Sequence, residues 1–312
     1  MKFFLAPMQG LTGYTVRNAF HHHFDYIDKY YTPFIPAAKR MNAKIKRDID
    51  PLNNDGITLI PQAMSIVADE VIDLHRQLVP YGYDEINVNL GCPSGTVVSK
   101  KRGSGILAYP DMLDSFLDEL YTKADFPVSI KTRVGFNDDE LWPRLIEIYS
   151  KYPISELTVH PRVQKDFYKN TPRMDDFALA MQKINPDKTI LCYNGDITDT
   201  NSFNALTDCF PDIDEIMIGR GLFANPALIA ELKGISMDKA ELRERLKNWH
   251  DEILSGYLSI FSGEKDAMFR MKEIWAYMHE LFSDSEKLWK KIKKCQTLND
   301  YKSIVRMAFD AF

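Results

Sequence analysis

Residues 84–107 read DEINVNLGCPSGTVVSKKRGSGIL, and this stretch decides how the rest of the chain is interpreted. The run 86–90 has the β-branched residues and the alternation of a short strand. The strand ends at Gly91-Cys92-Pro93, because proline donates no hydrogen bond to a sheet and glycine permits a sharp turn. We therefore expect Cys92 at the carboxyl end of a strand, beside a basic loop at 100–105. On these residues alone Cys92 is either a reactive thiol or a small buried side chain, the commoner role of a lone cysteine.

Seven further strand-like runs share the first two thirds of the chain with this one. Segments with helical spacing lie between most of them, and Thr12 is expected to cap the first helix. Eight alternating β/α units predict a (β/α)8 TIM barrel, an α/β fold, which we assign to residues 1–235. The other runs lie at 2–7, 26–32, 57–60, 127–133, 156–159, 189–193 and 215–218.

Polar and charged residues follow almost every one of these strands. The carboxyl ends of barrel strands carry the active site in this fold, so the repeated pattern favours function over packing for Cys92. The residues at these ends are Pro7, Met8, Gln9, Gln62, Asn89, Cys92, Lys131, Arg133, His160, Asn194, Gly195, Asp196, Gly219 and Arg220.

The last two strand ends suit a phosphate group. Glycine lets backbone N–H groups approach a phosphate and Arg220 adds a charged fork, although a plain glycine turn is the alternative. Lys131 could stabilise the negative charge of a reduced flavin ring. Gln62 could bind the pyrimidine edge of that ring, and Pro7-Met8-Gln9 could hold one of its faces. A thiol with its usual pKa of about 8.5 is protonated at neutral pH, so Cys92 suits a general acid better than a nucleophile.

From residue 236 the pattern changes to long helical runs at 238–257, 264–282, 285–294 and 300–312. They predict a second domain, a helical bundle over 236–312. The third run carries five lysines, and four of them share one helical face, which is either solvated or binds phosphates. These residues are Lys287, Lys290, Lys291 and Lys294.

Composition limits the partners. The net charge of −5 excludes a generally basic nucleic-acid binder, so an anionic partner needs local patches. The four cysteines show no paired spacing, which favours a reducing compartment and argues against a zinc site. With no signal-peptide pattern and no long apolar segment, we expect a cytoplasmic monomer without membrane or metal partners.

Two polar clusters leave alternatives open. The triple 21–23 consists of histidines at a helix end, where they suit the dipole or could bind a metal. The basic stretch is either a solvated face or an anion contact, and its members are Lys39, Arg40, Lys44, Lys46 and Arg47.

Several motifs together resemble the tRNA-dihydrouridine synthases. They are APMQG (6–10), NLGCPSGTV (89–97), GSGILAYP (103–110), KTRVG (131–135), HPR (160–162) with Tyr168, YNGDIT (193–198) and MIGRGLFANP (217–226). The chain departs from that family at Pro161, where glycine is usual, and at Pro33 and Pro36, where charged residues are expected.

The resemblance implies FMN, reduced by NADPH or NADH, which donates a hydride to C6 of a tRNA uracil while Cys92 protonates C5. It implies that Asn89, Arg133 and Tyr168 face the uridine, and that Arg270 and Lys272 on the helical tail meet the tRNA. The residues that it assigns to FMN are Pro7, Met8, Gln9, Gln62, Lys131, His160, Asn194, Gly195, Asp196, Gly219 and Arg220.

Two other functions fit part of the pattern. An FMN barrel of the dihydroorotate dehydrogenase kind, acting on a free pyrimidine, shares the phosphate loops but does not explain the basic helical tail. A barrel that binds RNA without catalysis explains the tail, but not the presence of both Cys92 and Lys131.

Overall fold

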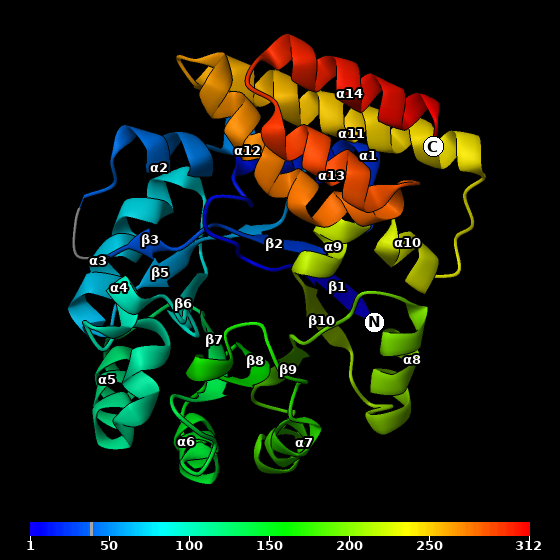
Figure 1. Cartoon of the computed structure of the whole chain (residues 1–312). Coiled ribbons are helices and arrows are strands. Elements are labelled where there is room, and N and C mark those ends of the chain that lie inside the picture. The colour runs from blue at the N-terminus through cyan, green and yellow to red at the C-terminus, as the bar shows by residue number, and fades with distance from the viewer. Residues whose placement is uncertain (38–39) are drawn as a thin grey trace.

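The structure, a computed structural model, describes residues 1–37 and 40–312. Lys39, one member of the basic stretch, lies outside these residues. The predicted barrel is confirmed: short parallel strands form a curled sheet with helices outside it (Figure 1). The strands are β1 (Lys2–Leu5), β2 (Lys29–Tyr31), β3 (Ile35–Pro36), β4 (Leu59–Ile60), β5 (Gln62–Met64), β6 (Ile86–Leu90), β7 (Val128–Gly135), β8 (Glu156–Val163), β9 (Ile190–Tyr193) and β10 (Glu215–Ile218).

The ten strands occupy eight positions around the barrel. Their order is β3-β5-β6-β7-β8-β9-β10-β1-β2-β4. The strand at one end, β3, follows β2 along the chain, and the strand at the other end, β4, directly precedes β5. β4 pairs with β2, and β5 pairs with both β3 and β6. Pro61 separates β4 from β5, and its carbonyl accepts from the Asn87 N–H at 2.9 Å. The strand position therefore continues through the proline and the barrel closes there.

Three local expectations differ from the structure. The second strand begins at Lys29 rather than Tyr26 and resumes after Pro33 as β3, and β8 runs on to Val163. The expected cap at Thr12 is wrong. Gly13 is the N-cap residue of the first helix, and the Asp48 carboxylate accepts a hydrogen bond from the Tyr14 N–H at 2.7 Å. A carboxylate that is distant in the sequence thus accepts the hydrogen bond that was expected to go to the local hydroxyl.

Most of the helices that cover the barrel follow a strand. They are α1 (Tyr14–His23), α2 (Ala43–Ile49), α3 (Ala68–Leu78), α4 (Gly95–Val98), α5 (Pro110–Lys123), α6 (Trp142–Tyr149), α7 (Met174–Lys183), α8 (Thr200–Cys209), α9 (Arg220–Ala224) and α10 (Leu228–Leu232). The amphipathic ones, such as α3, bury their apolar faces against the sheet.

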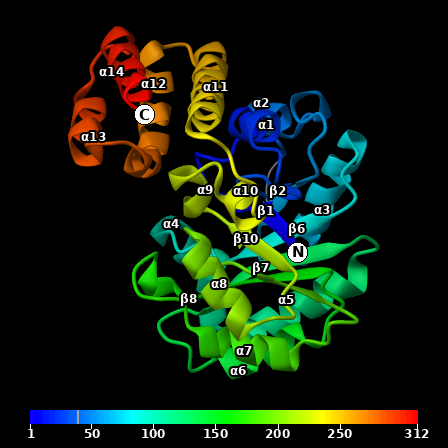
Figure 2. The same ribbon diagram turned by 90° about the vertical axis from the view of Figure 1, so that its right-hand side faces the viewer.

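Four helices after residue 236 pack together at one end of the barrel, as Figures 1 and 2 show. They are α11 (Lys239–Ile260), α12 (Glu264–Met278), α13 (Ser285–Lys294) and α14 (Leu298–Asp310). The predicted helical bundle is therefore confirmed, while the domain boundary at 235 stays a prediction.

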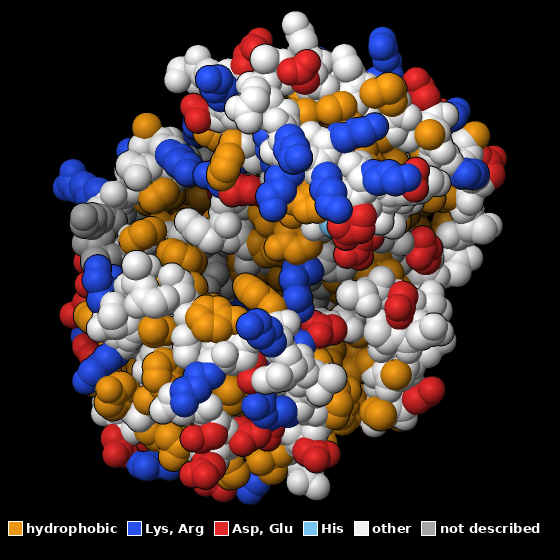
Figure 3. Space-filling model, viewed as in Figure 1, with side chains coloured by type: hydrophobic (Ala, Val, Ile, Leu, Met, Phe, Trp, Pro, Cys, Tyr) orange, Lys and Arg blue, Asp and Glu red, His pale blue; other side chains and the backbone are white. Residues whose placement is uncertain are grey.

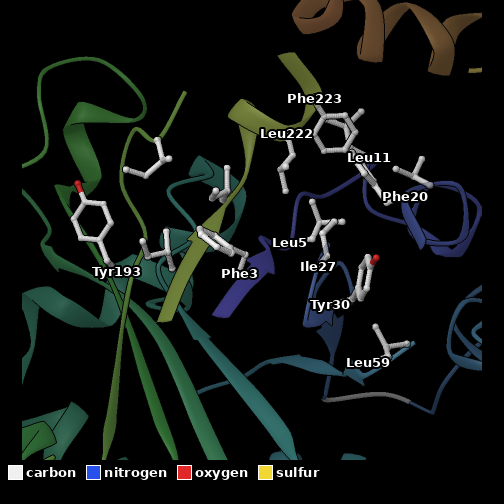
Figure 4. Packing of buried hydrophobic residues seen from close by; sticks show 14 of the residues in the cluster. Phe3, Leu5, Leu11, Phe20, Ile27, Tyr30, Leu59, Tyr193, Leu222 and Phe223 are labelled. Carbon is white, nitrogen blue, oxygen red and sulfur yellow. The ribbon is translucent and has the colours of Figure 1, made fainter. Parts of the chain in front are cut away.

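The barrel and the bundle share an apolar core. The Phe20 ring of α1 lies 5.1 Å from the Trp249 ring of α11 and 5.7 Å from the Phe223 ring of α9. Figure 4 shows Phe20 and Phe223 beside Leu11, at the loop after β1. The Phe223 ring in turn lies 6.2 Å from the Tyr277 ring of α12. This aromatic contact sets α12 next to the carboxyl ends of the strands.

Each histidine of the triple lies beside a carboxylate. His22 Nδ1 and His23 Nε2 each lie 2.8 Å from an oxygen of Glu252 on α11, and His21 Nδ1 lies 3.0 Å from Asp25. Within residues 1–37 and 40–312 no cluster of three or more His, Cys, Asp or Glu side chains could hold a metal ion. In the same part of the chain, no helix has the length and apolar character needed to cross a membrane.

Candidate functional site

A cavity of about 580 Å³ opens at the carboxyl ends of the barrel strands. Every residue predicted to act as acid, to hold the cofactor or to face the uridine lines it, so the structure brings these residues together. They are Pro7, Met8, Gln9, Gln62, Asn89, Cys92, Lys131, Arg133, His160, Tyr168, Asn194, Gly195, Asp196, Gly219 and Arg220. Arg270 and Lys272 do not line this cavity.

The turn that carries Cys92 is held from two sides. Asn89 Oδ1 accepts from the N–H groups of Gly91 and Cys92 at 3.1 and 2.9 Å. On the other side, the backbone N–H and the hydroxyl of Ser104 donate to the Cys92 carbonyl at 3.1 and 2.9 Å. Gly103 has a φ of +54°, and a Cβ there would lie 2.7 Å from that same carbonyl. The loop packs so closely on the turn that only glycine fits.

A buried chain of amides fixes Asn89 and Gln62. Asn89 Nδ2 donates to Gln62 Oε1 at 2.7 Å, Gln62 Nε2 donates to Asn87 Oδ1 at 2.8 Å, and Asn87 Nδ2 donates to Ser129 Oγ at 3.0 Å. An amide has two donors and two acceptor positions, so Gln62 keeps one donor and one acceptor for a ligand. These hydrogen bonds set the orientation of the Asn89 and Gln62 side chains before any ligand binds.

Burial changes the acidity of the two central groups. It raises the pKa of the Cys92 thiol and outweighs the opposing effects of the Ser94 N–H, Arg133 and Lys131. Cys92 is therefore a protonated thiol at neutral pH. Burial, with the Arg133 guanidinium beside it, lowers the pKa of Lys131 to about 7. An anion in the cavity would favour the charged form of this lysine.

Arg133 ties the turn after β6 to the end of β8 and to the loop that follows β8. Its Nε donates to the Gly91 carbonyl at 3.0 Å, Nη1 to Val163 at 2.9 Å and Nη2 to Phe167 at 2.7 Å. Its guanidinium carbon lies 5.7 Å from the centre of the Tyr168 ring. The structure thus gives Arg133 a positioning role, and its predicted contact with a uridine stays a prediction.

Asp196 is bound by two arginines. Arg220 Nη2 donates to Asp196 Oδ1 at 2.6 Å, and Arg162 donates to both carboxylate oxygens, with Nη1 at 2.9 Å from Oδ1. A carboxylate repels an anion, so Asp196 is suited to holding Arg220 in place rather than to binding an anion itself. The Arg220 guanidinium carbon also lies 4.8 Å from the centre of the Tyr168 ring.

The sequence pattern missed two groups of residues at this site. Arg162 is fully buried behind His160, and its place two residues after His160 in one strand was the available signal. Tyr277 reaches the cavity from α12, and Phe34 and Phe167 line it from loops. No local pattern marks these three, because only the packing of distant segments brings them to the cavity.

The two predicted tRNA residues of α12 differ in their surroundings. Arg270 Nη1 donates to Glu273 at 2.8 Å and lies 2.9 Å from where a Cβ on Gly10 would stand, so it sits at the rim of the barrel. Lys272 Nζ donates to the carbonyls of Lys293 and Cys295 at 3.2 and 2.6 Å. Lys272 therefore caps the end of α13, and its contact with RNA remains a prediction.

The four lysines that share one face of α13, called the α13 lysines below, are all exposed; they are Lys287, Lys290, Lys291 and Lys294. Figure 3 shows Lys and Arg side chains gathered over α12 and α13, above a hollow in the same face. An acidic protein thus carries a local basic patch beside its cavity.

Comparisons with known proteins agree on the fold and on a family. Among solved structures, morphinone reductase superposes with a TM-score of 0.52 at 11% identity, covering 77% of this chain and 88% of that one. A variant of NCR from Zymomonas mobilis gives the same TM-score and identity, covering 80% of this chain and 90% of that one. At such low identity these likenesses show the barrel fold alone.

Sequence relatives are more specific. A probable tRNA-dihydrouridine synthase of Staphylococcus aureus is 32% identical over 203 residues, which are 64% of this chain and 58% of that protein. The tRNA-dihydrouridine synthase B of Pasteurella multocida is 26% identical over 243 residues, 75% of this chain and 69% of that protein. The match to the first relative thus spans little more than half of its length. The family model for dihydrouridine synthases matches residues 4–311. The chain therefore belongs to the dihydrouridine synthase family.

Proposed function

We propose that the protein is a tRNA-dihydrouridine synthase, an oxidoreductase that reduces the C5–C6 double bond of uridines in tRNA. FMN is its bound cofactor, and NADPH or NADH is the reductant. The observation that carries the proposal is the place of Cys92, on a turn held from both sides and in one cavity with Lys131, Gly219 and Arg220. Burial raises the pKa of its thiol, which agrees with a proton donor.

The donors of the cavity fit a flavin mononucleotide. The phosphate would lie at the Asn194–Asp196 and Gly219-Arg220 loops, where Arg220 supplies charge. A Cβ on Gly219 would lie 3.4 Å from both the Ala6 Cβ and the Met8 sulfur, so the backbone here packs closely against the loop after β1. Gln62 would bind the polar edge of the ring with its remaining donor and acceptor, and Lys131 would face its negative charge.

The chain's own residues would hold and protonate the pyrimidine. FMN held in this cavity and reduced by NADPH or NADH would supply a hydride for C6 of the uracil. The Cys92 thiol donates the proton to C5, and its raised pKa keeps that proton in place at neutral pH. Asn89, through its contacts with Gly91 and Cys92, fixes the direction of the thiol.

The helical bundle over residues 236–312 would bind the tRNA body. Its basic patch lies beside the cavity (Figure 3). Arg270 lies next to Gly10 at the rim of the barrel. Phosphate contacts supply affinity without sequence information, which suits residues outside the reaction site. Tyr168, exposed between Arg133 and Arg220, would face the uridine as it enters.

The test is a reaction with purified protein, FMN, NADPH and unmodified tRNA, followed by mass spectrometry of the digested nucleosides. We expect dihydrouridine from tRNA, and none from the Cys92→Ala variant. Orotate and free uridine serve as competing substrates. Turnover of these alone would favour an enzyme of the dihydroorotate dehydrogenase kind, and tRNA binding without any reduction would favour a binding protein.

A further inference from the structure

We propose that Arg162 fixes His160 as a neutral imidazole with its proton on Nδ1, so that His160 acts only as a hydrogen-bond donor to an oxygen of the ligand in the cavity. The identity of that ligand, FMN, rests on the proposed function, whereas the tautomer does not. His160 and Arg162 lie on one face of β8 and are both buried.

The argument begins at the contact between the two side chains. Arg162 Nη1 lies 3.2 Å from His160 Nε2. A guanidinium has only donors and stays protonated in proteins, so the nitrogen that it meets must be the acceptor. A neutral imidazole has one donor and one acceptor nitrogen, so the ring proton belongs on Nδ1.

The position of Arg162 is set by its other contacts. It donates to both oxygens of Asp196, its Nε donates to the Lys169 carbonyl at 3.0 Å, and Nη2 donates to the Asn170 carbonyl at 2.5 Å. The guanidinium therefore cannot turn away from His160 without losing several charge-assisted hydrogen bonds.

The surroundings also oppose a second proton on the ring. His160 is buried, and the cations around it are Arg133, Lys131, Arg162 and Arg220. Burial first, and then these charges, hold the pKa of His160 well below its usual range. Among the residues that the structure describes, Nδ1 has no hydrogen-bond partner, and the side chain lines the cavity. The Nδ1–H group is thus left for a ligand oxygen.

The tautomer can be read directly by NMR in protein free of flavin and tRNA. Long-range ¹H–¹⁵N correlations of ¹⁵N-histidine-labelled protein distinguish protonated from unprotonated ring nitrogens. Two other histidines serve as internal standards. His75 Nε2 meets the Asp84 carbonyl at 2.9 Å and must carry a proton, while His279 Nδ1 meets the Trp275 carbonyl at 2.9 Å and must carry one there.

We expect His160, identified by the signals that His160→Gln removes, to show a protonated Nδ1 and an unprotonated Nε2. A proton on Nε2, alone or together with one on Nδ1, would overturn the proposal. Arg162→Met should release the preference and give a mixture of tautomers. Asp196→Asn keeps Arg162 with its hydrogen bonds to the Lys169 and Asn170 carbonyls and should keep the single tautomer, so it is the control. An Arg162→Met variant with an unchanged tautomer would remove Arg162 from this role.

The ligand contact has a separate readout, the affinity for FMN measured by quenching of its fluorescence. Loss of one hydrogen bond predicts about tenfold weaker binding for His160→Leu, and His160→Gln, which keeps a donor, should lose less. Equal losses in the two variants would contradict the donor role. A wild-type protein that binds no FMN would refute the proposed cofactor and leave the NMR result to decide the tautomer.

Discussion

We predict that Lys131 lowers the stability of the folded protein while it supports flavin binding and reduction. The variant Lys131→Met tests this. In the unfolded chain the pKa of a lysine is 10.5, whereas burial and Arg133 lower it to about 7 in the folded protein. Between these two values the unfolded chain binds more protons, so the free energy of unfolding rises with pH across this window. Below pH 7 the folded protein bears the full cost of a buried charge.

The size of the effect follows from the two pKa values. A fall from 10.5 to about 7, at about 1.4 kcal/mol for each tenfold change in the proton equilibrium, corresponds to about 5 kcal/mol. Lys131 opens on the cavity, and water there relieves part of the cost. We therefore expect Lys131→Met to stabilise the flavin-free protein by about 2 kcal/mol at pH 7, and by less at pH 9.

Urea denaturation of the flavin-free wild type and variant at pH 7 and pH 9 measures this. Lys29→Met is the matched control, because the half-buried ammonium of Lys29 lies 2.7 Å from Glu156 and its pKa is raised. Removal of that partner should destabilise the protein. The reasoning is refuted if Lys131→Met is less stable than wild type at pH 7, or if its advantage is the same at both pH values. The same variant should retain flavin poorly and reduce it slowly.

Three further predictions concern the reaction and the tRNA. Cys92→Ala should keep FMN and tRNA binding and lose 10²- to 10⁴-fold in product formation, roughly the share of a general acid, and a loss below about tenfold would exclude that role. Gly103→Ala should lower stability in thermal melts by at least about 1–2 kcal/mol and slow turnover, because its φ is +54° and its Cβ would meet the Cys92 carbonyl. Gly95→Ala, whose Cβ would meet open space, is the control, and equal effects in both variants would contradict the packing argument. Replacing the α13 lysines with glutamine should make the dependence of tRNA affinity on salt shallower by a few units, at about 0.7–0.9 for each phosphate contact, and leave flavin reduction by NADPH unchanged. An unaltered slope would show that the α13 lysines form a solvated face and do not bind phosphates.

The sequence alone was enough for the barrel and for most of the cavity wall. Strand alternation repeats locally, and the carboxyl ends of parallel strands meet on one face by topology, so residues such as Gln62, Lys131 and Asn194 could be assigned to one site. The glycine and proline at the Cys92 turn likewise act within a few residues of chain. In both cases the residues that determine the structure lie close together in the sequence.

Tertiary structure decided what depends on segments far apart in the chain. Tyr277 enters the cavity because aromatic packing from Trp249 through Phe20 and Phe223 sets α12 against the barrel. Lys272 meets the end of α13 rather than the open rim. The helix α1 is capped by Asp48 instead of Thr12. The acidities of Cys92 and Lys131 also follow from burial, which depends on the whole packed environment and not on neighbouring residues.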